Sequence, residues 1–248
     1  MSDIITIGVI GLGNAGSPIL NNLLKAKKYN LVAFDVDKNK LNNVPNDVIK
    51  ADSIKDLAEK CNTVLTCLPK PEHVLKAVDG ENGLLQNASS GMIWIDTSTT
   101  DFKQTQKLAA KAKTYGVSML EATLTGGVHA LQNNNMVCLA GGDKEIFNNW
   151  KEVLQDAIGE VVVLCGEIGA GAIAKVVSNM LAFTNMVAAS ECMMIAKKAG
   201  LDLESFFDAI RVSAGNSFAW ETVVPHIFNQ KYEAGFTMDL ACKDMNLS

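Results

Sequence analysis

The sequence predicts an α/β protein: a doubly wound, mostly parallel sheet at the N-terminus, followed by an all-α domain. Up to residue 166, β-branched runs alternate with segments of helical periodicity, which is typical of a parallel sheet covered on both faces. After residue 166 no strand pattern returns, and only helical patterns follow. The predicted domains are therefore residues 1–166 and 167–248, with no Pro/Ser-rich linker between them.

The first elements follow from local signals. The run IITIGVIG is rich in β-branched residues and predicts a strand. A helix over residues 17–28 follows, with Pro18 near its start, where a missing N–H removes no helical hydrogen bond. LVAFD is the next predicted strand. SIKDLAEK is predicted as a short helix, because Ser53 before it is a preferred N-cap residue.

The alternation continues through the rest of the predicted sheet. Pro69 ends a strand over TVLTCLP, and the elements after it are a helix over PEHVLKAV, a strand over MIWIDTST and a helix over residues 101–115. Three more strands are predicted over SMLEATLT, MVCLAGG and VVVLCG. A long helix over residues 170–199 is apolar on almost every side and needs more cover than its small domain supplies. We therefore expect a homodimer or homotetramer that forms through this helix.

Composition narrows the class of function. A net charge of −5 and a single arginine, Arg211, argue against nucleic-acid binding and against a site that grips phosphates with arginine forks. Three scattered histidines and no CxxC pair among six cysteines argue against a metal site. The N-terminus lacks a signal-peptide pattern, and polar residues interrupt the apolar helix 172–196, so we expect a cytoplasmic protein without a membrane segment.

A glycine-rich turn predicts a dinucleotide site in a Rossmann-type domain. Gly11, Gly13 and Gly16 form G-x-G-x-x-G between a predicted strand and a predicted helix, the context that this fingerprint requires. The glycines permit a tight turn and close approach of a pyrophosphate to the helix N-terminus. The residues predicted to bind the cofactor here are Gly11, Leu12, Gly13, Asn14, Ala15 and Gly16. The alternative is a glycine-rich turn with no ligand.

Asp35 ends the second predicted strand and completes the fingerprint. A carboxylate at this point accepts hydrogen bonds from the adenosine ribose and repels a 2′-phosphate. Val36 and Asp37 follow, with no arginine, which favours NAD over NADP. The alternative is an aspartate that only caps a turn.

Two later strand ends are also expected to face the cofactor, because ligands of such sheets lie at the carboxyl ends of the strands. They carry Leu68 and Pro69, and Thr97, Ser98 and Thr99. Farther on, Lys175 and Asn179 lie four residues apart in the apolar helix and so share one face. Burial would lower the pKa of such a lysine and suit it to proton transfer, whereas the alternative is a snorkelling lysine beside a surface asparagine.

In this order, these motifs resemble the β-hydroxyacid dehydrogenase family, which includes 3-hydroxyisobutyrate, tartronate semialdehyde and 6-phosphogluconate enzymes. The match runs from residue 4 to residue 246 and includes the T-G-G at residues 125–127 and the K-D at residues 243–244. The resemblance implies an NAD-dependent enzyme that oxidises a small hydroxy acid or reduces a semialdehyde.

The resemblance also implies roles for single residues. Lys175 matches the catalytic lysine and Asn179 its neighbour, while Thr99 matches a threonine at the nicotinamide end of the cofactor. The other matches are with the segment that binds the substrate carboxylate, namely Thr125, Gly126 and Gly127, and with a lysine near the active site, Lys243, which is expected to contact both substrate and cofactor.

The chain departs from the pattern of the resembled family at several points. Relatives often have DAPVSGG where this chain has EATLTGG, so Thr123 replaces a proline and Glu121 an aspartate. His129 stands close to the expected substrate pocket, where it either contacts an acidic head group of the substrate or lies on the outer surface of the loop. Asn134 replaces a glycine in a turn that asparagine tolerates. The chain ends at Ser248, where relatives continue, so we expect a C-terminally truncated member.

Other functions remain open from the sequence. A non-catalytic dinucleotide-binding or assembly protein of the same fold is one, although such proteins typically lack the lysine. A related reductase for tartronate, succinic or sulfonated semialdehyde is another. The single arginine disfavours a 6-phosphogluconate-type enzyme, and Asp35 and Lys175 disfavour an NADPH-dependent imine reductase. The sequence leaves the head group of the substrate and the physiological direction undecided.

Overall fold

The structure is a computed structural model of the 248-residue chain, and it describes residues 4–230 and 237–246, without the side chains of residues 128 and 129. The side chain of His129 therefore lies outside the described part. The chain divides into two compact units, residues 1–175 and 176–246. The division falls within the long helix α9 (Ala170–Lys198), beyond residue 166. The functional domains expected at residues 1–166 and 167–248 stay a prediction.

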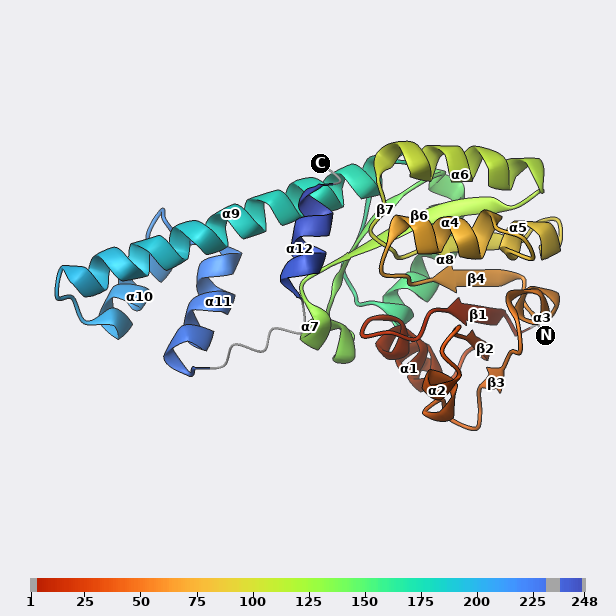
Figure 1. The fold of residues 1–248 in the computed structure, drawn as a ribbon, viewed down its shortest axis with the longest axis horizontal. Coiled ribbons are helices and arrows are strands. Elements are labelled where there is room, and N and C mark those ends of the chain that lie inside the picture. The colour runs from red at the N-terminus through yellow and green to blue at the C-terminus, as the bar shows by residue number, and fades with distance from the viewer. Residues whose placement is uncertain (1–3, 231–236, 247–248) are drawn as a thin grey trace. The chain divides into compact units, whose positions relative to one another are not determined.

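The first unit is built on one eight-stranded sheet (Figure 1). Its spatial order is β3-β2-β1-β4-β5-β6-β7-β8, and every pair is parallel except the antiparallel pair β6–β7. The strands are β1 (Thr6–Ile10), β2 (Asn30–Phe34), β3 (Ile49–Lys50), β4 (Thr63–Thr66), β5 (Ile93–Asp96), β6 (Ser118–Thr125), β7 (Val137–Gly141) and β8 (Val162–Gly166). The predicted doubly wound sheet is confirmed.

The register aligns the carboxyl ends of β1, β4 and β5 with the middle of β6. Ile10 of β1 pairs with Thr66 of β4, Thr66 with Asp96 of β5, and Asp96 with Glu121 of β6. A row of polar side chains thus crosses the sheet just where the turns of the predicted cofactor site begin. In open α/β sheets this edge is where ligands bind.

Helices cover both faces of the sheet, and each face has its own apolar core. One core joins the strands to α1, α7 and α8 through residues such as Ile19, Leu131 and Leu154. The other joins them to α3, α4, α5 and α6 through residues such as Leu57 and Trp94. The helices of this unit are α1 (Gly16–Ala26), α2 (Lys38–Asn42), α3 (Ile54–Lys60), α4 (Pro71–Asp79), α5 (Leu84–Asn87), α6 (Phe102–Thr114), α7 (Val128–Gln132) and α8 (Lys144–Ala157).

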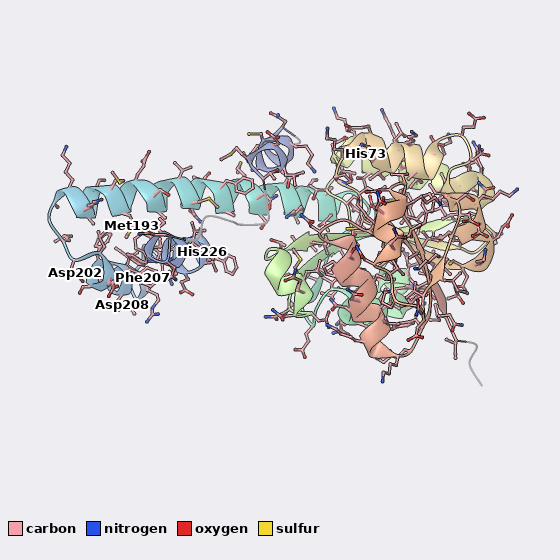
Figure 2. The ribbon with its side chains drawn as sticks, turned by 60° about the horizontal axis from the view of Figure 1, so that its bottom comes forward. His73, Met193, Asp202, Phe207, Asp208 and His226 are labelled. Carbon is pink, nitrogen blue, oxygen red and sulfur yellow. The ribbon has the colours of Figure 1, made fainter. Side chains whose placement is uncertain are left out.

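The second unit is all helical, as predicted. The rest of α9 is followed by α10 (Leu203–Arg211), α11 (Phe218–Phe228) and α12 (Met238–Met245). A small core joins Met193 of α9 to Trp220 of α11, with Phe206 and Phe207 of α10 packed against it. Figure 2 shows Met193 and Phe207 together in this cluster of helices.

Helix α9 keeps much of its apolar surface exposed. The side chains with the largest exposed fractions are Leu181, Val187, Met194 and Ile195, at 56–68%. Among the described helices, α9 alone is long and apolar enough, by length and composition, to cross a membrane. The polar residues within α9 do not take it out of this class. A core helix of a soluble protein passes the same test.

Candidate active site

The glycine-rich turn joins β1 to α1 at the carboxyl edge of the sheet. Gly11 has a φ of 96°, and a Cβ there would lie 2.4 Å from the carbonyl oxygen of Cys67. A Cβ on Gly16 would lie 1.8 Å from the carbonyl oxygen of Gly11. Side chains are therefore excluded at both positions by the protein's own backbone.

Gly13 is glycine for a different reason. A Cβ on Gly13 would meet no heavy atom of the protein within 4 Å, so the fold itself does not demand a glycine. In the described part of the chain, no side chain caps the first turn of α1, and that turn contains no acidic residue. Open space beside Gly13 and an uncapped helix N-terminus are what a pyrophosphate group needs. The residues present therefore fit a bound dinucleotide.

Asp35 lies next to this turn and is 5% exposed. Its carboxylate accepts hydrogen bonds from the N–H of Leu12 at 2.7 Å and from the N–H of Asp37 at 2.8 Å, and Lys40 Nζ lies 3.2 Å away. Burial opposes ionisation of Asp35, but these three donors outweigh it and hold the pKa of its carboxyl below the usual range. The structure thus brings Asp35 and the glycine-rich turn together, with a charged carboxylate at the place predicted for the ribose.

The ends of β4 and β5 form the next part of the same edge. The hydroxyl of Ser98 accepts a hydrogen bond from the N–H of Leu68 at 3.0 Å, and Thr97 donates to the carbonyl of Thr66 at 2.8 Å. Leu68 and Thr99 are half-buried, and Pro69 is exposed. The two predicted strand-end segments are therefore bound to each other beside the glycine-rich turn.

Asp96 is a buried carboxyl beneath these segments that the sequence reasoning did not assign. It accepts hydrogen bonds from Thr66 Oγ1 at 2.8 Å and from the N–H of Ser98 at 3.1 Å, and Trp94 Nε1 donates to Thr66 Oγ1 at 2.8 Å. Burial raises the pKa of Asp96 to about 6, against the opposing effect of these hydrogen bonds. Its local signals were its place at the end of a strand and the D-x-S-T that it begins.

We expect Asp96→Asn to remove a pH-dependent loss of stability. Because the pKa of Asp96 rises from 3.8 to about 6 on folding, the folded state holds this proton more tightly than the unfolded chain. Its contribution to the free energy of unfolding is thus fully present below about pH 4 and lost as the pH rises through about 6, by about 3 kcal/mol. Thermal melts across this range should show the Tm of the variant rising relative to the native chain. A difference that stays flat, as we expect for the exposed control Asp47→Asn, would contradict this assignment.

Two glycines follow β6 directly. Gly126 and Gly127 have φ values of 126° and 89°, which favour glycine. Thr125 is half-buried and both glycines are exposed, and a Cβ on Gly127 would meet no protein atom within 4 Å. The turn is therefore open at the residues predicted to bind the substrate carboxylate.

Helix α9 carries the two residues predicted to be catalytic. Lys175 is half-buried and lies at the end of the first compact unit. Asn179 is 7% exposed and belongs to the second unit. Within the second unit, Asn179 Nδ2 donates to Asp244 Oδ2 at 2.7 Å, and Lys243 Nζ lies 2.8 Å from Asp244 Oδ1. The structure thus brings Asn179 together with Lys243, through Asp244. The K-D pair was the sequence signal for Asp244, which is 3% exposed and was not itself predicted to act.

Family models match both parts of the chain. Residues 6–166 match the NAD-binding domain of 6-phosphogluconate dehydrogenase, and residues 169–248 match the model described as NAD-binding of NADP-dependent 3-hydroxyisobutyrate dehydrogenase. A probable mitochondrial 3-hydroxyisobutyrate dehydrogenase of Dictyostelium discoideum is 31% identical over 98% of this chain and 78% of its own length. The chain belongs to the β-hydroxyacid dehydrogenase family.

Other members of the β-hydroxyacid dehydrogenase family agree in sequence and in fold. The 2-(hydroxymethyl)glutarate dehydrogenase of Eubacterium barkeri is 30% identical over the whole chain and 82% of its own length. The 3-hydroxyisobutyrate dehydrogenase of Mycobacterium tuberculosis, solved with L-serine, matches with a TM-score of 0.90 and 28% identity, over 98% of this chain and 85% of that one. The expected family and fold class are confirmed, and the match of residues 6–166 to an NAD-binding domain supports a nicotinamide dinucleotide as the cofactor.

Proposed function

We propose that this dehydrogenase transfers a hydride between NAD(H) and a small β-hydroxy acid or the matching semialdehyde, such as 3-hydroxyisobutyrate. The observation that carries the proposal is the half-buried Lys175 in the second turn of α9, at the position that resembles the catalytic lysine of the family. A half-buried lysine of that kind suits proton transfer better than a solvated one. In this proposal residues 1–166 bind the cofactor, and residues 167–248 serve substrate binding and dimerisation.

The cofactor we propose is NAD rather than NADP. Gly11 to Gly16 would hold the pyrophosphate, Asp35 the adenosine ribose, and Leu68, Pro69 and Thr99 the part of the cofactor toward the nicotinamide. The charged carboxylate of Asp35 supports this choice, since it repels a 2′-phosphate. When bound, NAD supplies the acceptor for the hydride that leaves the carbinol carbon.

The protein's own groups handle the proton and the substrate. Lys175 Nζ would take the hydroxyl proton in the oxidation and return it to the carbonyl oxygen in the reduction. Asn179 would hold the substrate hydroxyl, with its amide oriented by Asp244. The N–H groups of Thr125, Gly126 and Gly127 would bind the substrate carboxylate, and Lys243 would add a positive charge.

A nicotinamide-absorbance assay tests this function. It offers a panel of β-hydroxy acids with NAD or NADP, and the matching semialdehydes with the reduced cofactors. We expect turnover with NAD(H), and the best substrate of the panel then names the enzyme. Cofactor binding without turnover of any pair would support a non-catalytic role, and a clear preference for NADP would overturn the interpretation of Asp35.

We also propose a cytoplasmic homodimer or homotetramer formed through residues 170–199. The exposed apolar side chains of α9 support an oligomer, because a patch of this kind is rarely left in water. Light scattering should give at least twice the chain mass of 26.6 kDa. The double variant Val187→Lys, Ile195→Lys should shift the mass toward that of one chain. An oligomer unaffected by this variant would place the interface elsewhere.

A further inference from the structure

Glu121 is a buried carboxylate that no step of the proposed reaction uses. It lies in the middle of β6 and is 2% exposed. A charge so buried is costly unless other groups stabilise it. Burial raises the pKa of Glu121, and backbone N–H groups oppose that rise.

The groups that stabilise Glu121 belong to the start of α9. The N–H of Gly169, just before the helix, donates to Glu121 Oε2 at 2.5 Å, and the N–H of Ala172, in its first turn, donates to Oε1 at 3.1 Å. First-turn N–H groups have no partner within their own helix, and Gly169 has no side chain to cap them. The sheet thus supplies the cap, from a residue 48 positions away in the sequence, and the carboxylate also suits the helix dipole.

The neighbouring atoms leave this turn little freedom. A Cβ on Gly141 would lie 2.2 Å from Glu121 Oε2 and 2.8 Å from the nitrogen of Gly171. A Cβ on Gly171 would lie 3.0 Å from the carbonyl oxygen of Leu139. The first turn of α9 therefore lies directly on the backbone of β7.

Thr123 adds a second contact from the same face of β6. Its hydroxyl lies 2.9 Å from the carbonyl oxygen of Leu139 and 3.2 Å from that of Gly171, so one proton is shared between strand and helix. This accounts for a threonine where the resembled family has proline. In this first turn of α9, Glu121 accepts hydrogen bonds from N–H groups, and Thr123 lies within donor distance of the carbonyl oxygen of Gly171.

The contact between β6 and the first turn of α9 lies close in sequence to both the proposed acid–base group and the proposed carboxylate site. Lys175 lies one helical turn after Ala172, hence on the same side of α9. Thr125 follows Thr123 by two residues, so it points to the same face of β6. The strand that carries the proposed carboxylate site thus also grips the helix that carries the proposed acid–base group.

We propose that Glu121 is a positioning residue, which with Thr123 fixes the first turn of α9 so that Lys175 is held in place relative to the substrate segment 125–127. This extends the proposed function and assumes it. Misplacement of a catalytic group by about 1 Å can cost on the order of a hundredfold in rate, whereas loss of a helix cap alone would lower only stability.

The test compares Glu121→Gln and Thr123→Val with the native chain. Glutamine keeps the shape but replaces one acceptor oxygen with a donor, so it cannot accept both N–H groups. The matched control is Glu145→Gln, the same change at an exposed position in the first turn of α8. The readouts are hydrogen–deuterium exchange of residues 167–175, NAD affinity, and kcat and KM measured separately.

We expect Glu121→Gln to speed exchange in residues 167–175 and to lower kcat by about tenfold to a hundredfold, with NAD affinity within about twofold. Thr123→Val should act in the same direction more weakly, and Glu145→Gln should change nothing. Faster exchange with native kcat would reduce Glu121 to a helix cap and overturn the proposal. Joint loss of kcat and NAD affinity would also overturn it, because the damage would then be general.

Two further outcomes are decided by the same measurements. If Glu121→Gln does not fold, Thr123→Val decides: a lower kcat at native NAD affinity supports the proposal, and a native kcat overturns it. If the native chain turns over no substrate, the proposed function fails by itself. Exchange in the two variants then shows separately whether Glu121 anchors the helix.

Discussion

Lys175→Ala should lower kcat for the best hydroxy acid by about 10²–10⁴-fold, the range that a positioned acid–base group contributes. NAD affinity should stay within about twofold, because the residues that fit the cofactor lie in the turn after β1, at Asp35 and at the ends of β4 and β5. The measurement is nicotinamide absorbance under saturating NAD, with NAD binding followed separately by calorimetry.

Two further variants test whether Lys175 transfers a proton or only supplies a positive charge. Lys175→Arg keeps a positive charge but cannot release its proton at ordinary pH, so it should be nearly as slow as the alanine variant. Lys198→Ala removes an exposed lysine at the other end of α9 and should leave kcat unchanged. If Lys175→Arg kept more than about half of the native kcat, Lys175 would act as a fixed charge and the proposed proton transfer would be wrong.

The fold was predictable because its signals are local. β-branched runs, glycine turns and the Ser53 cap each lie within a few residues, and the side chain of Ser53 accepts the N–H of Asp56 as an N-cap does. Asn134 takes the expected left-handed conformation, with a φ of 51°. Helix α8 was not predicted, although the sequence carries its signals. Asp143 caps it, and its apolar residues recur at helical spacing. The antiparallel pairing of β7 was not predicted, because strand direction is a property of the whole sheet.

The candidate site was predictable only where a motif places residues near one another in the sequence. The glycine-rich turn and Asp35 are joined by a hydrogen bond from the N–H of Leu12 to the carboxylate of Asp35, across 23 residues and within a single βαβ unit. The contacts of Glu121 with α9 and of Asn179 with Asp244 span 48 and 65 residues. A carboxylate in a strand gives no local sign of whether it will meet water, a lysine or the N-terminus of a distant helix. Those partners are set by packing, so only the structure supplies them.

Gly13→Val should abolish NAD binding without destabilising the fold. The added side chain starts in space where no protein atom lies within 4 Å, and Gly13 does not have the positive φ that would strain it. The same space is where the pyrophosphate must approach the backbone. We expect the Kd for NAD to rise at least about a hundredfold, about 2.7 kcal/mol, with a native Tm in the absence of NAD. NAD should raise the Tm of the native chain but not that of the variant.

Gly16→Ala is the contrasting change in the same turn. Its Cβ would lie 1.8 Å from the carbonyl oxygen of Gly11, which forces the turn or the start of α1 to move. That variant should lose both NAD affinity and stability, the latter by about 1–3 kcal/mol, as overpacked sites do. The two variants thus separate the two reasons for glycine in this motif. Gly16 is needed for the close packing of the turn against the start of α1, and Gly13 is needed for the approach of the ligand. Native NAD affinity in Gly13→Val would show that the pyrophosphate does not bind at this turn. A lowered Tm in the absence of NAD would show that the fold itself needs this glycine.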